Sequence, residues 1–562
     1  MRTTRPVFVL VVALALVTTP VVAGVGATEG GDATAKPTAA VPTATESLDN
    51  HTAPPDPETD VLGWEDGYWH NESISVNPED GLNDTELEKV VARGMARVEY
   101  VRELEFEETP PVEIITRDAY TENVEAQYGN LTEADRLRHN VKYEALFMVN
   151  ESRDSVAVER NNQAGGVGGY YDPGAEEIKV ISNNVSTPKL DEITLAQELF
   201  HALQDQQYNL SRYNQTTREL HNAKDGIIEG DGNYVDYLYQ QQCDEGSWNG
   251  TCLRPQDSGS PSDFSPHIGL YQILFQPYST GPAFVRHIRQ QGGWEAVNAI
   301  YENPPASTEQ TIHPEKYGTD PPRNVSVPDT SQGPWRQLEL NRSSPTANYS
   351  VPFAQFGEAG LFVALWYPGY ETRGQTQVIP YNAHLNRTAS GGVNEFQPYL
   401  YNHPATAGWD GDRLVPYVTN DSAETNETGY VYRLAWDSEA DATDFRQTWL
   451  ELMRFHGAEA VEGNQNTYRI ADGQEFGDAF YVTQSGDTVT IVNGPTVADL
   501  SRIAEGAAPA AQDDGDNGTD MGTTEMENAT DATTDGAGPG FTVVAAVLAL
   551  LAAALAAGRR AA

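Results

Sequence analysis

The order of apolar and polar residues predicts both helices and strands along the chain. Apolar residues recur at helical spacing over 84–103, with Asn83 or Asp84 as the N-cap, and over 225–241. A helix capped by Thr187 carries the segment 194–206. Further helices are predicted at 356–365 and 438–454, and strands at 111–116, 144–148, 155–158, 177–181, 430–435, 480–483 and 488–492. This mixture predicts the α+β class.

A glycine-rich stretch, 165–174, lies just before the strand at 177–181. It resembles a phosphate-binding loop in composition, but it lacks the lysine and the following helix that such a loop needs. We therefore expect a β-hairpin at this position.

The N-terminus has the pattern of a secretory signal. Arg2 and Arg5 precede the apolar run 7–22, and small residues at 23–27 offer a cleavage site. An exported chain is therefore expected. Residues 28–60, which are rich in Ala, Thr, Pro and Asp, predict a disordered spacer.

The C-terminus has the pattern of a membrane anchor. An acidic stretch with almost no apolar content is followed by Pro539-Gly540-Phe541, an apolar run to Ala557 and two arginines. At ~1.5 Å per residue the run spans roughly 25 Å, enough for a transmembrane helix whose arginines stay in the cytoplasm. The ectodomain is then held outside the cell.

A chain of 562 residues is too long for one compact core, so two globular domains are expected. The predicted segments are a signal peptide (1–27), a spacer (28–60), a first domain (61–330), a smaller α+β lobe (345–506), an acidic disordered linker (507–538) and a sorting segment with a transmembrane helix (539–562).

The net charge of the chain excludes some classes of binding partner. The chain has 82 acidic and 35 basic residues and a net charge of −47, spread along its length. Such a surface repels nucleic acid and anionic membranes, and high salt would screen its self-repulsion. A salt-adapted protein that does not bind nucleic acid is predicted.

Two further features fit an exported protein. Cys243 and Cys252 are close in sequence, and a disulfide is expected rather than a two-cysteine metal site. Asn-x-Ser/Thr sequons are frequent, for example at Asn184 and Asn209, and predict a glycoprotein in which some sites are occupied.

The candidate chemistry lies in Gln197-Glu198-Leu199-Phe200-His201, which departs from the zinc-peptidase pattern H-E-x-x-H at one position. In the intact pattern two histidines on one helical face bind zinc, and the glutamate between them activates a water. Here a glutamine replaces the first histidine. Glu229, in the predicted helix 225–241, is expected to face the buried side.

Two resemblances follow from these residues. Acidity, the N-terminal signal and the Pro539-Gly540-Phe541 tail resemble the exported surface proteins of halophilic archaea. In that group an archaeosortase recognises the tail, removes the helix and leaves a lipid anchor. The resemblance implies attachment to the cytoplasmic membrane by the helix or by a lipid, with archaeosortase as a partner.

The second resemblance covers 86–317. The strand at 177–181, the helix with Glu198 and His201, and the helix with Glu229 are similar to gluzincin-type metallopeptidases of bacteria and archaea, and the similarity continues at 278–284, 292–297, 304–310 and 313–317. It implies a zincin-like first domain followed by the second lobe.

The resemblance also assigns roles. His201 and Glu229 would be zinc ligands and Glu198 the general base, while Gln197 stands in the position of the missing ligand. An amide oxygen binds zinc less well than an imidazole nitrogen. Gln197 could still ligate weakly, or His221 or His313 could complete the shell.

Two functions stay open. The first is a surface protein with lost or weakened peptidase activity, in which the four residues form a hydrogen-bonded relic and the protein binds peptide or protein partners. The alternative is an active zinc peptidase that acts on extracellular polypeptides. Metal content distinguishes them.

Overall fold

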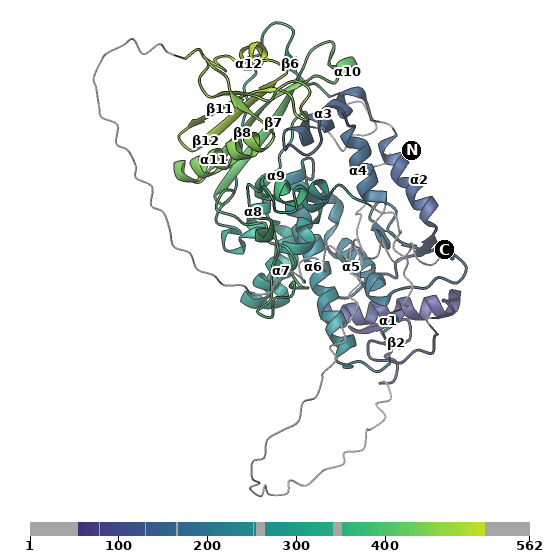
Figure 1. Ribbon diagram of the computed structural model, residues 1–562. Coiled ribbons are helices and arrows are strands. Elements are labelled where there is room, and N and C mark those ends of the chain that lie inside the picture. Colours follow the sequence, from purple (N-terminus) through teal and green to yellow (C-terminus); the bar gives the residue numbers. More distant parts are fainter. Residues whose placement is uncertain are drawn as a thin grey trace, which may run out of the picture. The chain divides into compact units, whose positions relative to one another are not determined.

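The computed structural model describes residues 54–511, except 78, 130, 165–166, 251, 255–264 and 341–350 (Figure 1). The predicted signal peptide, most of the spacer, residues 512–538 of the acidic linker and the sorting segment lie outside the described residues. Within the described part, no helix combines the length and the apolar character needed to cross a membrane.

The described chain divides into two compact units that interleave in sequence. Unit 1 contains residues 54–121, 167–212 and 232–254, and unit 2 contains residues 122–164, 213–231 and 265–511. Two helices, α2 (Arg117–Tyr128) and α6 (Arg218–Asp244), contribute residues to both units.

Unit 1 combines short strands with two long helices. Its elements are β1 (Trp64–Glu65), β2 (Tyr68–Trp69), α1 (Asp84–Arg102), β3 (Val112–Ile115), β4 (Gly169–Asp172), β5 (Glu177–Ile181), α5 (Glu192–Tyr208) and η1 (Leu210–Arg212). The sheet order is β3-β5-β4, with β3 parallel and β4 antiparallel to β5. The predicted hairpin is therefore confirmed as β4 and β5.

Helix α1 confirms the prediction for 84–103. The side chain of Asn83 accepts a hydrogen bond from the Glu86 amide (3.1 Å), and Glu86 accepts one from the Asn83 amide (3.1 Å). This capping box satisfies amide donors that otherwise have no partner at the start of a helix. Gly94 lets α1 approach α5 closely, because a Cβ atom there would lie 2.9 Å from Leu199 Cδ1.

Unit 2 contains most of the remaining elements. They are α3 (Glu133–Glu144), α4 (Ser155–Ala164), α7 (Ile268–Glu302), α8 (Thr308–Ile312), η2 (Pro314–Lys316), β6 (Arg336–Gln337), α9 (Gly357–Glu371), η4 (Tyr381–His384), β7 (Trp409–Val418), α10 (Ser422–Thr425), β8 (Gly429–Trp436), α11 (Glu439–Phe455), β9 (Glu459–Ala460), β10 (Thr467–Arg469), β11 (Ala479–Ser485), β12 (Thr488–Gly494) and α12 (Val497–Ile503).

An antiparallel sheet of seven strands, in the order β6-β7-β8-β12-β11-β10-β9, organises the C-terminal part of unit 2 (Figure 1). Alternate residues of β8 enter different cores: Tyr430 and Tyr432 pack with α9 and α11, whereas Val431 packs with α12. This period of two is expected for a sheet covered on both faces. The predicted hairpin at 480–492 is confirmed as β11 and β12.

The strands predicted at 144–148 and 155–158 are wrong. Residues 145–149 form a buried turn after α3, and Ser155 begins α4, where its amide and hydroxyl both donate to Asn140 Oδ1 (3.0 and 2.9 Å). A short apolar run fits a buried turn or helix as well as a strand. Unit 1 and unit 2 each mix helices with sheet, so the α+β class is confirmed.

Candidate functional site

Helix α5 carries three of the four predicted site residues. Its N-cap is Asp191, whose carboxylate accepts hydrogen bonds from Ile193 N (2.9 Å) and Thr194 N (3.2 Å). The predicted cap at Thr187 is wrong, because the Thr187 hydroxyl accepts a hydrogen bond from Asn184 and the helix begins only at Glu192. The helix nevertheless includes the whole segment 194–206.

The three residues on α5 are buried inside unit 1. Gln197 is 6% exposed, and Glu198 and His201 are each 1% exposed. Gln197 and His201 are four residues apart and so lie on one face of the helix. Strand β4 approaches this helix closely at Gly169, since a Cβ atom added there would lie 3.4 Å from Glu198 Cγ.

His201 has a defined orientation. Its Nδ1 atom lies 2.7 Å from Oε1 of Gln204, a carbonyl oxygen that only accepts hydrogen bonds, so Nδ1 is the donor in this contact. The ring also packs against Gly232 of α6, where a Cβ atom would lie 3.1 Å from Cε1 and 3.5 Å from Nε2. Glycine at 232 therefore permits the position of this imidazole.

Glu229 lies on the part of α6 that belongs to unit 2, and its side chain is fully buried there. The same helix segment is fixed to α7. Gly230 and Gly281 are in backbone contact, since a Cβ atom on Gly230 would lie 2.6 Å from the Gly281 carbonyl carbon. The Tyr301 hydroxyl donates to Asp231 Oδ2 (2.8 Å).

His221 and His313, the two histidines considered as replacement ligands, are engaged inside unit 2. His221 contacts Asp225 through Nε2 (3.0 Å) and Gln215 Oε1 through Nδ1 (2.6 Å). His313 Nε2 lies 3.1 Å from the Glu358 carboxylate. Binding zinc through Nε2 would cost either residue its carboxylate partner.

The donor set fits a catalytic zinc poorly. Such a site needs three protein ligands, usually with two or more imidazole or thiolate donors, and leaves the fourth position to water. The four predicted residues supply one imidazole, two carboxylates and one neutral amide. Imidazole is the donor that suits zinc best among these groups.

A buried ionic cluster holds the start of α5. Glu192 accepts hydrogen bonds from Arg93 Nη2 (2.9 Å), Arg97 Nη1 (2.5 Å), the Tyr239 hydroxyl (2.6 Å) and Leu253 N (2.8 Å). Burial opposes the ionisation of Glu192, but the two arginines and the hydrogen bonds hold its pKa below the usual value. These contacts tie α1, α5 and α6 together within unit 1.

The disulfide belongs to the same region. Cys243 at the end of α6 is bonded to Cys252, with Cα atoms 5.9 Å apart. The bond closes the loop that brings the backbone of Leu253 to Glu192 and places the Trp248 ring 4.5 Å from the Arg97 guanidinium. The disulfide thus supports the cluster at the start of α5.

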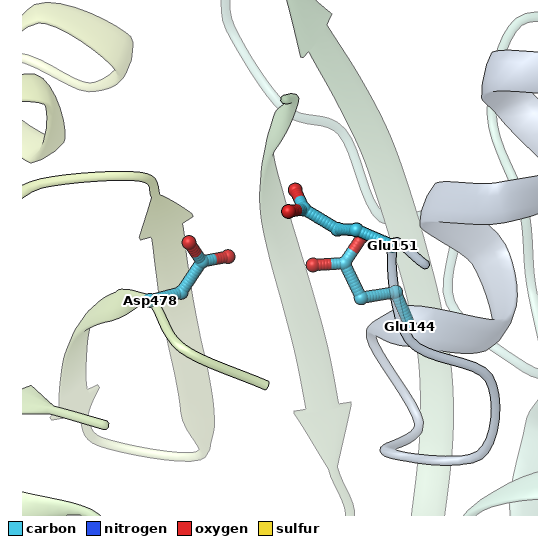
Figure 2. Close-up of side chains that lie close together, drawn as sticks. All are labelled: Glu144, Glu151 and Asp478. Atoms are coloured by element: carbon cyan, nitrogen blue, oxygen red, sulfur yellow. The ribbon is translucent and has the colours of Figure 1, made fainter. Parts of the chain in front are cut away.

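The structure also gathers carboxylates that the sequence analysis did not single out. Glu144, Glu151 and Asp478 of unit 2 have oxygen atoms that all lie within 4.8 Å of one another (Figure 2). Glu144 and Glu151 are seven residues apart and Asp478 is distant in sequence, so no spacing rule reveals the group. The one signal was a charge within an apolar stretch, as at Glu144 in Tyr-Glu-Ala-Leu-Phe.

A second acidic group, formed by Glu309, Asp320 and Asp437, differs from the first because a lysine lies among its carboxylates. The Lys316 ammonium lies 2.6 Å from Glu309, 2.9 Å from Asp320 and 2.8 Å from Asp437. A protein cation already occupies this group.

Comparison with known proteins gives one match. A family model, a domain of unknown function (DUF8575), matches residues 348–504, which lie in unit 2. No curated protein and no solved structure matches the chain. The matched stretch includes Asp478 but none of Gln197, Glu198, His201 and Glu229.

Proposed function

We propose that the chain is an exported surface protein of a halophilic archaeon whose zincin-like region binds a peptide or protein partner and has lost or weakened metallopeptidase activity. The observation that carries the proposal is Gln197, a buried amide at the position that a zinc ligand would take. The membrane anchor and export are proposed from the terminal segments and the acidic composition.

Donor chemistry supports weakened metal binding. A glutamine in place of a histidine removes the imidazole donor, and the two histidines considered as replacements are already bound to carboxylates. Glu198 and His201 are each 1% exposed, as expected for groups retained in a structural role.

One observation favours the alternative, an active zinc peptidase. Gln204 accepts a hydrogen bond from His201 Nδ1 and so fixes the orientation of the imidazole. Metal-binding histidines commonly have such a partner on the other ring nitrogen. His201 and Glu229 would then be ligands, Gln197 a weak third ligand and Glu198 the base.

Zinc content tests the proposal directly. We expect the full chain, purified in high salt and incubated with zinc, to retain far less than one equivalent and to leave unstructured polypeptides uncleaved. Stoichiometric zinc together with metal-dependent cleavage would overturn the proposal in favour of the peptidase.

The variant Gln197→His tests the ancestry of the site. Restoring the imidazole should tighten zinc binding about ten-fold or more, since ligand changes of this kind act on affinity over one to two orders of magnitude. Gln206→His, which adds a histidine elsewhere on α5, is the matched control and should not change the affinity. Equal affinities in both variants would contradict a zincin-like site.

A further inference from the structure

The acidic group of unit 2 joins two segments that are distant in sequence. Glu144 ends α3, Glu151 lies in the connection to α4, and Asp478 lies directly before β11. Figure 2 shows the three carboxylates directed toward one another from these segments. Glu144 is 7% exposed and Asp478 is 5% exposed, so water screens their repulsion poorly.

A buried hydroxyl beside this group lacks a partner. Tyr430 of β8 is 1% exposed, and its hydroxyl makes no hydrogen bond within the described part of the chain. Burial raises the pKa of Tyr430, and the neighbouring Glu144 and Asp478 carboxylates raise it further. A buried polar atom without a partner is uncommon and calls for a bound water or ion.

Strand register supports this placement. Tyr430 pairs with Asn493 of β12, so both side chains are on the same face of the sheet. Asn493 Nδ2 donates to Asp478 Oδ2 (2.9 Å). The hydroxyl and the carboxylate are therefore held on one face by two adjacent strands.

The protein supplies little positive charge to this group. Burial raises the pKa of Glu144 and Asp478, and it raises that of Glu151 to about 7, with the like charges adding to the shifts of the two glutamates. Glu144 and Asp478 also share a hydrogen bond, which raises the pKa of Glu144 further and opposes the rise at Asp478. Arg469 acts on Asp478 but is bonded to Asp472 and the Pro495 carbonyl. Glu427 adds further negative charge.

We propose that Glu144, Glu151 and Asp478 bind one divalent cation of the hard class, Ca²⁺ or Mg²⁺, at the end of the unit 2 sheet. All available donors are oxygens, which these ions prefer. Oxygens that bind one Ca²⁺ at ~2.4 Å are at most ~4.8 Å apart, so one oxygen from each of the three carboxylates, all within 4.8 Å of one another, can share one ion. The Tyr430 hydroxyl bonds a water on the ion.

The site has a structural role that is independent of the function proposed above. The ion cancels the repulsion between the α3–α4 connection and the strand end at Asp478. Removing the ion therefore weakens the attachment of this connection to the sheet.

Calcium and magnesium titrations of the full chain in high-salt buffer test the proposal. We expect one equivalent to bind by calorimetry and the Tm to rise by roughly 3 °C or more at saturating ion, with the rise reversed by a chelator. No saturable binding of either ion, or an unchanged Tm, would overturn the proposal.

The variant Glu151→Gln separates a specific site from general binding to an acidic surface. Glu151 is half-buried in a connection, and the isosteric amide removes one carboxyl from the group, so the variant should fold. Its ion-free Tm should equal or exceed that of the wild type, while its affinity for the ion should fall about ten-fold or more.

Asp320→Asn is the matched control, because it also removes one carboxylate from a three-carboxylate group, the one occupied by Lys316. It should bind the ion as the wild type does. An undiminished response to the ion in Glu151→Gln, or an equal loss in both variants, would refute the assigned site.

Discussion

Glu192→Gln tests the cluster that positions the start of α5. The wild-type carboxylate is fully buried and accepts from both Arg93 and Arg97, whose side chains are 1% and 0% exposed. The substitution keeps the size of the side chain but removes its charge. It also replaces one carboxylate oxygen, which accepts hydrogen bonds, with an amide NH₂ group, which donates them. The NH₂ group then faces the N–H and O–H donors that the oxygen had accepted from.

The expected cost follows from the burial of both partners. Removing one member of a buried ion pair leaves uncompensated charge and costs about 3–5 kcal/mol. Two arginines lose their shared counterion here, so we expect the upper part of this range. For a unit of this size, each 1 kcal/mol lowers the Tm by about 2–4 °C, so the transition of unit 1 should fall by about 10 °C or more.

Thermal unfolding followed by circular dichroism checks this value. A buried pair is screened little by salt, so the difference from wild type should persist from moderate to high salt. Glu79→Gln, which removes the exposed partner of Lys189 at 3.8 Å, is the control and should cost less than about 1 kcal/mol. A Glu192→Gln effect as small as the control, or one that disappears with salt, would refute the reasoning.

Two other outcomes are expected. Burial raises the pKa of Glu65 to about 9 and that of Glu99 to about 7. Because both values exceed the ordinary value of 4.5, the stabilisation is complete below about pH 4.5, falls as the pH rises from there, and is fully lost above about pH 9. Glu65→Gln should flatten the fall in Tm over this range, whereas the exposed Glu88→Gln on α1 should reproduce the wild-type curve. Gly230→Ala, which would stabilise an exposed helix, should instead cost about 1–3 kcal/mol in denaturant unfolding, because its methyl group meets the backbone of Gly281; a stabilised variant would contradict that contact.

The sequence predicted correctly those elements that depend only on residues close together in the chain. The N-cap at Asn83 and the hairpin at 165–181 depend on near neighbours and were confirmed. The cap of α5 was predicted at Thr187 but lies at Asp191, because the Pro188 carbonyl accepts a hydrogen bond from Leu82 N (2.9 Å) and Pro188 lies before the helix. Local sequence does not contain that partner.

The sequence by itself determined which chemical groups are present: Gln197 in place of an imidazole, Glu198 and His201 on one helix, and the excess of acidic residues. Only the tertiary structure decided their partners. It placed Gln204 on His201, and it brought Asp478 to Glu144 across more than half of the chain. Helix periodicity is a local property, whereas burial and charge compensation depend on residues that come together only when the chain folds.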